Sequence, residues 1–157
     1  VKVVKEMAQV IVGAEKWHMT YRRERGRLEG QFTRTDEAIA SAVMNTANHL
    51  DVKAIVALTE SGSTPLWMSR IRSDIPIYAF TRHERTLRRV TLYRGVYPIP
   101  FDVTHTNPEV LYPKIFALLL DLGLARSGDL IIVTKGEMSG VTGGTNTMKI
   151  LEVRGEG

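Results

Sequence analysis

The sequence of Ala54–Arg72, AIVALTESGSTPLWMSRIR, predicts a strand, a tight turn and a helix in direct succession. Ala54–Leu58 is short, apolar and partly β-branched, which is typical of a buried strand. Ser61–Ser63 are small turn-forming residues that end this strand. Thr64 is then expected to cap a helix with Pro65 at its first position, where the missing N–H costs nothing.

A strand that delivers small, hydroxyl-bearing residues to the start of a helix is typical of an anion site. Unpaired backbone N–H groups and the positive end of the helix dipole meet there, and hydroxyl groups add donors. We therefore predict that Thr59–Thr64, named here the phosphate loop, binds phosphate. Its candidate residues are Thr59, Ser61, Gly62, Ser63 and Thr64. The alternative is a plain strand-to-helix connection whose Ser and Thr only cap the helix.

The composition favours one soluble domain with a substantial core. The chain has 157 residues, of which 43% are hydrophobic, and a net charge of +4. It contains no cysteine, which excludes disulfides and thiolate metal sites and fits a reducing compartment such as the cytoplasm. No segment approaches the roughly 20 apolar residues needed to span a bilayer, so we expect no membrane partner.

Arginine is concentrated in two stretches, Tyr21–Arg34 and Arg82–Arg94. Such stretches bind nucleic acid, acidic partners or anionic small molecules, or they are solvated helix faces. No nucleic-acid recognition motif accompanies the charge, so we predict no nucleic-acid partner.

Hydrophobic periodicity predicts the remaining elements. Helices are expected at residues 1–16, 35–50, 81–93 and 107–122, and strands at 75–80, 96–101, 130–133 and 147–153. Residues 17–34 show no clear period and are interpreted as a linker. Pro98 and Pro100 exclude a central position in the sheet for strand 96–101.

Strands that alternate with helices predict an α/β fold, here a three-layer αβα domain around a mostly parallel five-stranded sheet. Strand 147–153 follows a loop without a helix, so it is expected to run antiparallel at an edge. Ligands of such sheets bind beyond the carboxyl ends of the strands. The phosphate loop and Lys135–Asn146, named here the glycine-rich loop, both leave strands at that edge.

The glycine-rich loop is the second candidate for anion binding. Glycine lets backbone amides approach an anion closely, and Lys135 can neutralise its charge. The candidate residues are Lys135, Gly136, Gly140, Gly143 and Gly144. The sequence matches neither GxGxxG nor GxxxxGK[ST], so a hairpin loop without a ligand is the alternative.

The residues indicate neither a catalytic site nor a metal site. The four histidines fall in separate predicted elements without a shared ligand spacing. No GxSxG elbow and no recognisable pair of carboxylates is present. We therefore assign no catalytic residue and no metal ligand.

Several stretches together resemble the C-terminal domain of pyruvate kinase. The resemblance runs from TDEAIA at Thr35 through TESGST and LYRGV, and includes GDLIIVTKG and TNTMKILEV. Residues 1–16 resemble the last helix of the catalytic barrel of that enzyme, so we expect them to belong to a barrel domain outside this chain. Residues 17–34 are then a linker, and residues 35–157 form the effector-binding domain. The segments EAIA…ANHL and TRHERTLRR are most similar to those of bacterial forms regulated by AMP or sugar monophosphates.

This resemblance implies a regulatory function. The effector phosphate is expected in the phosphate loop, with Lys135–Gly144 closing over it; that segment lacks the Trp-Arg-Pro-Gly pattern of members regulated by fructose 1,6-bisphosphate. The implied effectors are AMP, ribose 5-phosphate or glucose 6-phosphate. The family also implies a homotetramer that uses Thr147–Val153 and Thr35–Leu50. Its catalytic residues, Mg²⁺ and K⁺ belong to the barrel, so this chain alone is expected to be inactive and to need no cofactor. The alternative is a freestanding sugar-phosphate or nucleotide-binding module.

Overall fold

The computed structural model describes residues 2–21, 31–102, 107–136 and 144–155. Contacts divide the chain into two units, Val1–Gln31 and Phe32–Gly157. The first unit contains helix α1 (Lys2–Tyr21), which ends at Tyr21 rather than at the predicted Lys16. Gly13 does not end this helix, because an interior glycine costs only about 1 kcal/mol. Large apolar side chains of α1 are more than half exposed: Val3, Val4, Met7, Val10 and Ile11.

The second unit is built on a five-stranded sheet with the order β3-β2-β1-β4-β5. The strands are β1 (Ala54–Leu58), β2 (Ile77–Thr81), β3 (Val96–Pro100), β4 (Leu130–Gly136) and β5 (Thr145–Glu152). The first four are parallel to one another, and β5 pairs antiparallel with β4. These pairings confirm the predicted sheet and its antiparallel edge strand.

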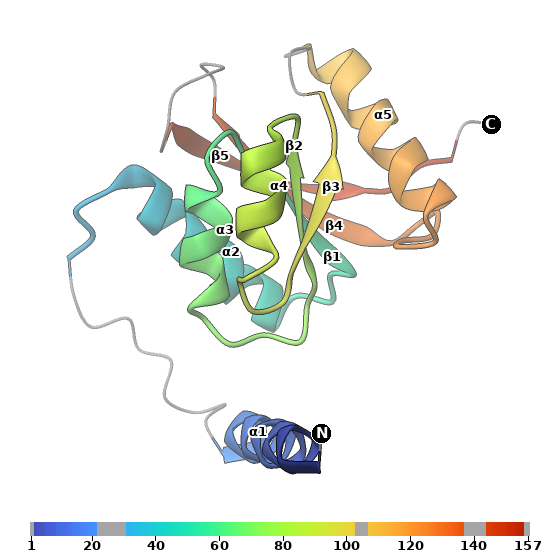
Figure 1. The fold of residues 1–157 in the computed structure, drawn as a ribbon. Coiled ribbons are helices and arrows are strands. Elements are labelled where there is room, and N and C mark those ends of the chain that lie inside the picture. The colour runs from blue at the N-terminus through green and yellow to red at the C-terminus, as the bar shows by residue number, and fades with distance from the viewer. Residues whose placement is uncertain (1, 22–30, 103–106, 137–143, 156–157) are drawn as a thin grey trace. The chain divides into compact units, whose positions relative to one another are not determined.

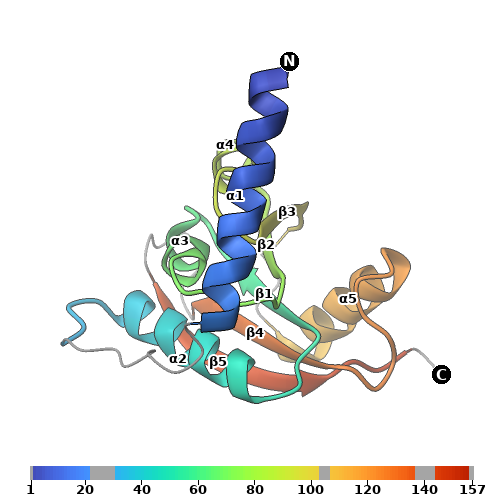
Figure 2. The same ribbon diagram turned by 90° about the horizontal axis from the view of Figure 1, so that it is seen from below.

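Helices cover both faces of the sheet and complete the predicted three layers (Figure 1). The helices α2 (Thr35–His49), α3 (Ser63–Ser69) and α4 (Glu84–Val90) lie on one face, and α5 (Pro108–Asp121) lies on the other. Figure 2 shows the same arrangement from below. Alternate residues of β1 supply two cores: Ala54, Val56 and Leu58 pack with α5, while Ile55 and Ala57 pack toward α2 and α3. All five are buried, as a central strand requires.

Strand β3 lies at one edge of the sheet, as its prolines predict. The N–H of Ile77 donates to Gly95 O, and the N–H of Phe101 donates to Thr81 O. Odd-numbered residues of β3 therefore direct their backbone groups toward β2. The ring nitrogens of Pro98 and Pro100 face the open edge, where no N–H is needed.

Two further predicted boundaries are wrong. Helix α4 begins at Glu84 and not at Thr81, because Thr81 is still part of β2 and pairs with Pro100. The glycine-rich loop is also shorter than predicted: β4 continues to Gly136 and β5 begins at Thr145. Lys135 and Gly136 are therefore strand residues at the foot of that loop.

Candidate functional site

The two predicted loops leave the sheet side by side. Strands β1 and β4 are neighbours, with Ala57 opposite Thr134, so the residues after Leu58 and after Gly136 lie at the same carboxyl edge. This is the edge at which open α/β sheets bind ligands. The fold thus brings the phosphate loop and the foot of the glycine-rich loop together.

The phosphate loop enters α3 through a left-handed glycine. Gly62 is the N-cap residue with φ of +80°, and its carbonyl accepts from Leu66 N at 3.1 Å. Inside the loop, Thr59 Oγ1 accepts from Gly62 N at 2.9 Å. Thr64 does not cap the helix and Pro65 is not its first residue, so this detail of the prediction is wrong. Gly62 has no side chain that could accept a hydrogen bond from the first turn of α3.

Three backbone donors of the phosphate loop remain available. Within the described residues, the N–H groups of Ser61, Ser63 and Thr64 donate to no acceptor. Because α3 has only seven residues, its dipole is small, and the predicted anion binding therefore depends on these N–H groups. Ser61 and Ser63 are half-buried, so both are accessible from the solvent.

Gly62 meets a second constraint besides its φ. A Cβ atom at this position would lie 3.0 Å from Val90 Cγ1 of α4. We expect Gly62→Ala to lower the free energy of unfolding by about 2 kcal/mol, because backbone strain and crowding add. The control is Gly95→Ala, where φ is +69° and no atom lies within 4 Å, with an expected loss of about 1 kcal/mol. Equal losses in urea denaturation would contradict the constraint from Val90.

Ser63 belongs to a charged network that sequence reasoning did not predict. Its Oγ donates to Asp36 Oδ2 at 2.8 Å and lies 3.5 Å from Arg34 Nη2. Arg34 also donates two hydrogen bonds to Asp36, from Nε to Oδ1 at 2.9 Å and from Nη2 to Oδ2 at 2.8 Å. Asp36 is only 1% exposed. The hydrogen bond from Arg34 lowers the pKa of Asp36, although burial alone would raise it.

A buried hydrogen bond joins the two loop regions. Thr64 Oγ1 donates to Thr145 Oγ1 at 2.7 Å, and both residues are almost fully buried. This bond connects the first turn of α3 to the first residue of β5. Close to it in the sheet, Thr134 is fully buried and its hydroxyl has no partner among the described residues.

Glu60 places a carboxylate inside the phosphate loop. Its Oε2 contacts His83 Nε2 closely and lies 3.9 Å from Arg82 Nε. Its Oε1 is buried and has no hydrogen-bond partner in the described part of the chain. The backbone carbonyl of Glu60 accepts from Thr86 Oγ1 at 2.7 Å, which ties the loop to α4.

Only part of the glycine-rich loop lies within the described residues. Gly136 and Gly144 approach each other so closely that a Cβ at Gly136 would lie 2.6 Å from Gly144 O. Lys135 stands beside them on β4. Gly140 and Gly143 lie outside the described residues. Phosphate binding by this loop therefore stays a prediction.

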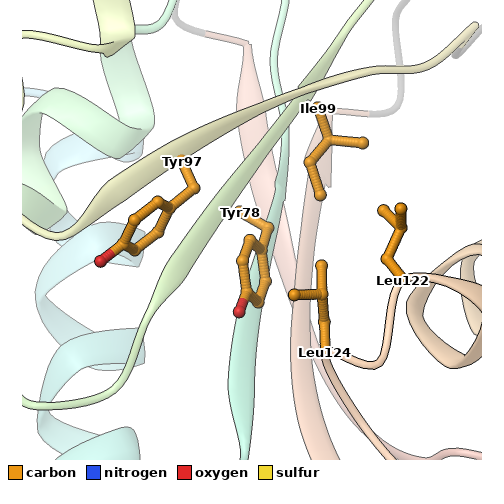
Figure 3. Close-up of a pocket in the computed structure, with 5 residues that line it drawn as sticks. All are labelled: Tyr78, Tyr97, Ile99, Leu122 and Leu124. Atoms are coloured by element: carbon orange, nitrogen blue, oxygen red, sulfur yellow. The ribbon is translucent and has the colours of Figure 1, made fainter.

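An apolar cavity of about 340 Å³ lies elsewhere, on the face that α5 covers. Figure 3 shows Tyr78 and Tyr97 side by side, with Ile99, Leu122 and Leu124 opposite them. Burial, and to a smaller extent Tyr97, raises the pKa of Tyr78. Among the described residues, its lining includes no member of either predicted loop and no cation, so it does not suit a phosphorylated ligand.

The described residues offer neither a cluster of metal ligands nor a membrane span. No three His, Asp or Glu side chains gather into a possible ion site in the described ranges. No helix there combines the length and the apolar character needed to cross a bilayer.

Sequence reasoning missed Arg34, Asp36 and Thr145 as neighbours of the phosphate loop. Arg34 fell in the predicted linker, and Asp36 in the first turn of a helix is explained by the helix dipole alone. Thr145 is 81 positions from Thr64. Their contacts with the loop leave no local sequence signal, because they depend on the packing of α2 and β5 beside α3.

Comparison with known proteins gives a consistent family. A family model described as the pyruvate kinase alpha/beta domain matches residues 37–151. Pyruvate kinase II of Salmonella typhimurium is 46% identical over 153 residues, which is 97% of this chain and 32% of that protein. Pyruvate kinase of Geobacillus stearothermophilus is 39% identical over 96% of this chain and 25% of that protein.

A solved structure supports the same assignment. A pyruvate kinase from Cryptosporidium parvum superimposes with a TM-score of 0.68 and 28% identity, covering 79% of this chain and 24% of that chain. The chain spans about a third of the length of the Salmonella relative. Since the family model covers most of the chain, and the relatives match nearly all of it, this chain belongs to the pyruvate kinase family and contains its C-terminal alpha/beta domain.

Proposed function

We propose that this chain is the effector-binding and assembly domain of a cytoplasmic pyruvate kinase. The parent reaction transfers a phosphoryl group from phosphoenolpyruvate to ADP and yields pyruvate and ATP. The observation that carries the proposal is the phosphate loop, whose N–H groups at Ser61, Ser63 and Thr64 have no acceptor among the described residues. Such groups at the carboxyl edge of an α/β sheet suit a phosphate.

Catalysis is assigned to the part of the enzyme that this chain does not cover. In the resemblance, the catalytic lysine and the residues for Mg²⁺ and K⁺ belong to the barrel. No three His, Asp or Glu side chains of the described ranges gather into a cluster that could hold Mg²⁺. The exposed apolar side chains of α1 are proposed to pack against that barrel. The chain alone is therefore expected to bind an effector without transferring phosphate.

The proposed effector carries one phosphate group. Glu60 places a carboxylate within the phosphate loop, and a second phosphate close to it would be repelled. The glycine-rich loop also lacks the Trp-Arg-Pro-Gly pattern of the bisphosphate-regulated members. AMP, ribose 5-phosphate and glucose 6-phosphate satisfy this requirement.

Assembly is proposed to use β5. The opposite edge, β3, has Pro98 and Pro100 directed outward and cannot donate from those positions. Strand β5 has eight residues and no proline, so its free edge can pair with a second copy of the chain. The bond between Thr64 and Thr145 connects the phosphate loop to this strand. Regulation then requires that two quaternary states bind the effector with different affinity.

Calorimetry of the 157-residue chain tests the proposal. AMP, ribose 5-phosphate, glucose 6-phosphate and fructose 1,6-bisphosphate would each be titrated at low salt. We expect saturable binding of at least one monophosphate, and weaker binding of the bisphosphate. If no monophosphate gives heat or raises the melting temperature, the chain has no self-contained effector site and the proposal is wrong.

A further inference from the structure

A cation stands beside the phosphate loop on the side of α2. Arg34 directly precedes that helix, and its Nη2 lies 3.5 Å from Ser63 Oγ. Its side chain is 49% exposed, so a ligand can reach it. We infer that Arg34 binds the phosphate group of the ligand together with the N–H groups of Ser61 and Ser63. This inference rests on the phosphate site proposed above.

The loop needs this positive charge because carboxylates flank it on two sides. Asp36 contacts Ser63 directly, and Glu60 is part of the loop itself. A phosphate dianion held by backbone N–H groups alone would be repelled by both. Arg82 and His83 are placed against Glu60. Among the described residues, Arg34 is the basic side chain that contacts both Asp36 and Ser63.

Arg34 keeps donors for a ligand while it holds Asp36. A guanidinium has five N–H groups in a fixed planar fork. Nε and Nη2 bond to the two oxygens of Asp36. No bond from Nη1 is recorded among the described residues, and this nitrogen carries two N–H groups. A phosphate can therefore be bound without breaking the ion pair, which holds the fork in place.

The position of Arg34 in the chain gives this contact a consequence. Arg34 stands close to Phe32, where the second unit begins. A ligand that contacts both Arg34 and Ser63 would tie the segment entering the α/β domain to the loop between β1 and α3.

The test compares how the affinity for phosphate changes when the charge is removed at Arg34 and when it is removed at Arg126. Ribose 5-phosphate and inorganic phosphate would be titrated calorimetrically into the full chain and into Arg34→Gln, Arg34→Lys and Arg126→Gln. We expect Arg34→Gln to weaken binding about tenfold or more, because charge-assisted hydrogen bonds are lost. Arg34→Lys should lose about threefold, since it keeps the charge but not the fork. Arg126 is exposed and follows α5, away from the loop, so its variant should bind as the unaltered chain does.

Asp36→Asn separates ligand binding from a purely structural effect. Asn keeps an amide oxygen that can accept a hydrogen bond from Arg34 and so hold it beside the loop, while it removes a negative charge, so the affinity should be equal or higher. If Arg34→Gln binds like the unaltered chain, or if Asp36→Asn weakens binding as much as Arg34→Gln, Arg34 does not bind the ligand. In that case the phosphate site itself stands, because the unaltered chain still binds. Absence of binding by the unaltered chain would overturn both proposals.

Discussion

Ser61→Asp is expected to weaken binding of a sugar monophosphate at least 100-fold while the domain stays folded. Ser61 is half-buried at the centre of the phosphate loop, next to Glu60. A carboxylate there would lie within a few ångströms of the bound phosphate. At about 4 Å and an effective dielectric constant of about 20, two unit charges repel by roughly 4 kcal/mol. A 100-fold loss of affinity corresponds to about 2.7 kcal/mol of binding free energy, which is less than this estimated repulsion.

The matched control is Ser61→Ala. It removes the hydroxyl but retains the backbone N–H, so we expect less than about a fivefold loss of affinity. Calorimetry with ribose 5-phosphate measures both variants, and thermal melting verifies that they are folded. Binding by Ser61→Asp with unaltered affinity would show that the phosphate does not lie in this loop.

Asp36→Ala is expected to lower the free energy of unfolding by about 2 kcal/mol at pH 7. The substitution removes the acceptor of Arg34, of Ser63 Oγ and of Glu37 N. Hydrogen bonds to charged groups contribute about 1.5–3 kcal/mol, and we use the lower part of this range because Arg34 is half exposed. Glu37→Ala removes a negative charge from the same helical turn without these bonds and should cost about 0.5 kcal/mol or less.

The contribution of Asp36 to the free energy of unfolding should decrease as the pH is lowered. The hydrogen bond from Arg34 lowers the pKa of Asp36 in the folded chain. A group with a lowered folded pKa stabilises above its unfolded pKa, about 3.9, and this stability is lost as the pH falls below it. The difference between the unaltered chain and Asp36→Ala should therefore be constant between about pH 7 and 5 and shrink toward pH 3. A difference that stays the same or grows at pH 3, in urea denaturation, would contradict this account.

The sequence predicts the elements of this fold because each carries its own periodicity or turn residues. Ala54–Leu58 is continuously apolar since both of its faces are buried, and Pro98 and Pro100 identify an edge strand. Contacts that depend on which strands pair with each other cannot be predicted in this way. Thr64 was expected to cap α3, but its hydroxyl is directed to Thr145, whose nearness follows only from the pairing of β4 with β5.

The candidate site was therefore predicted as a loop and not as a network. Small residues after a buried strand predict an anion site at Thr59–Thr64 from the local sequence alone. The charges around it come from α2 and from the segment after β2, through Arg34, Asp36 and Arg82. Arginines in a stretch without periodicity are predicted to be solvated. No local sequence pattern identifies an arginine, such as Arg34, that contacts a loop elsewhere in the fold.

An NMR titration of the ¹⁵N-labelled chain with ribose 5-phosphate tests the central claim most directly. If the phosphate loop binds the phosphate, the amide signals of Ser61, Ser63 and Thr64 should move together and saturate with one apparent affinity. Unchanged signals at these three residues, or shifts confined to the apolar cavity around Tyr78 and Tyr97, would contradict it.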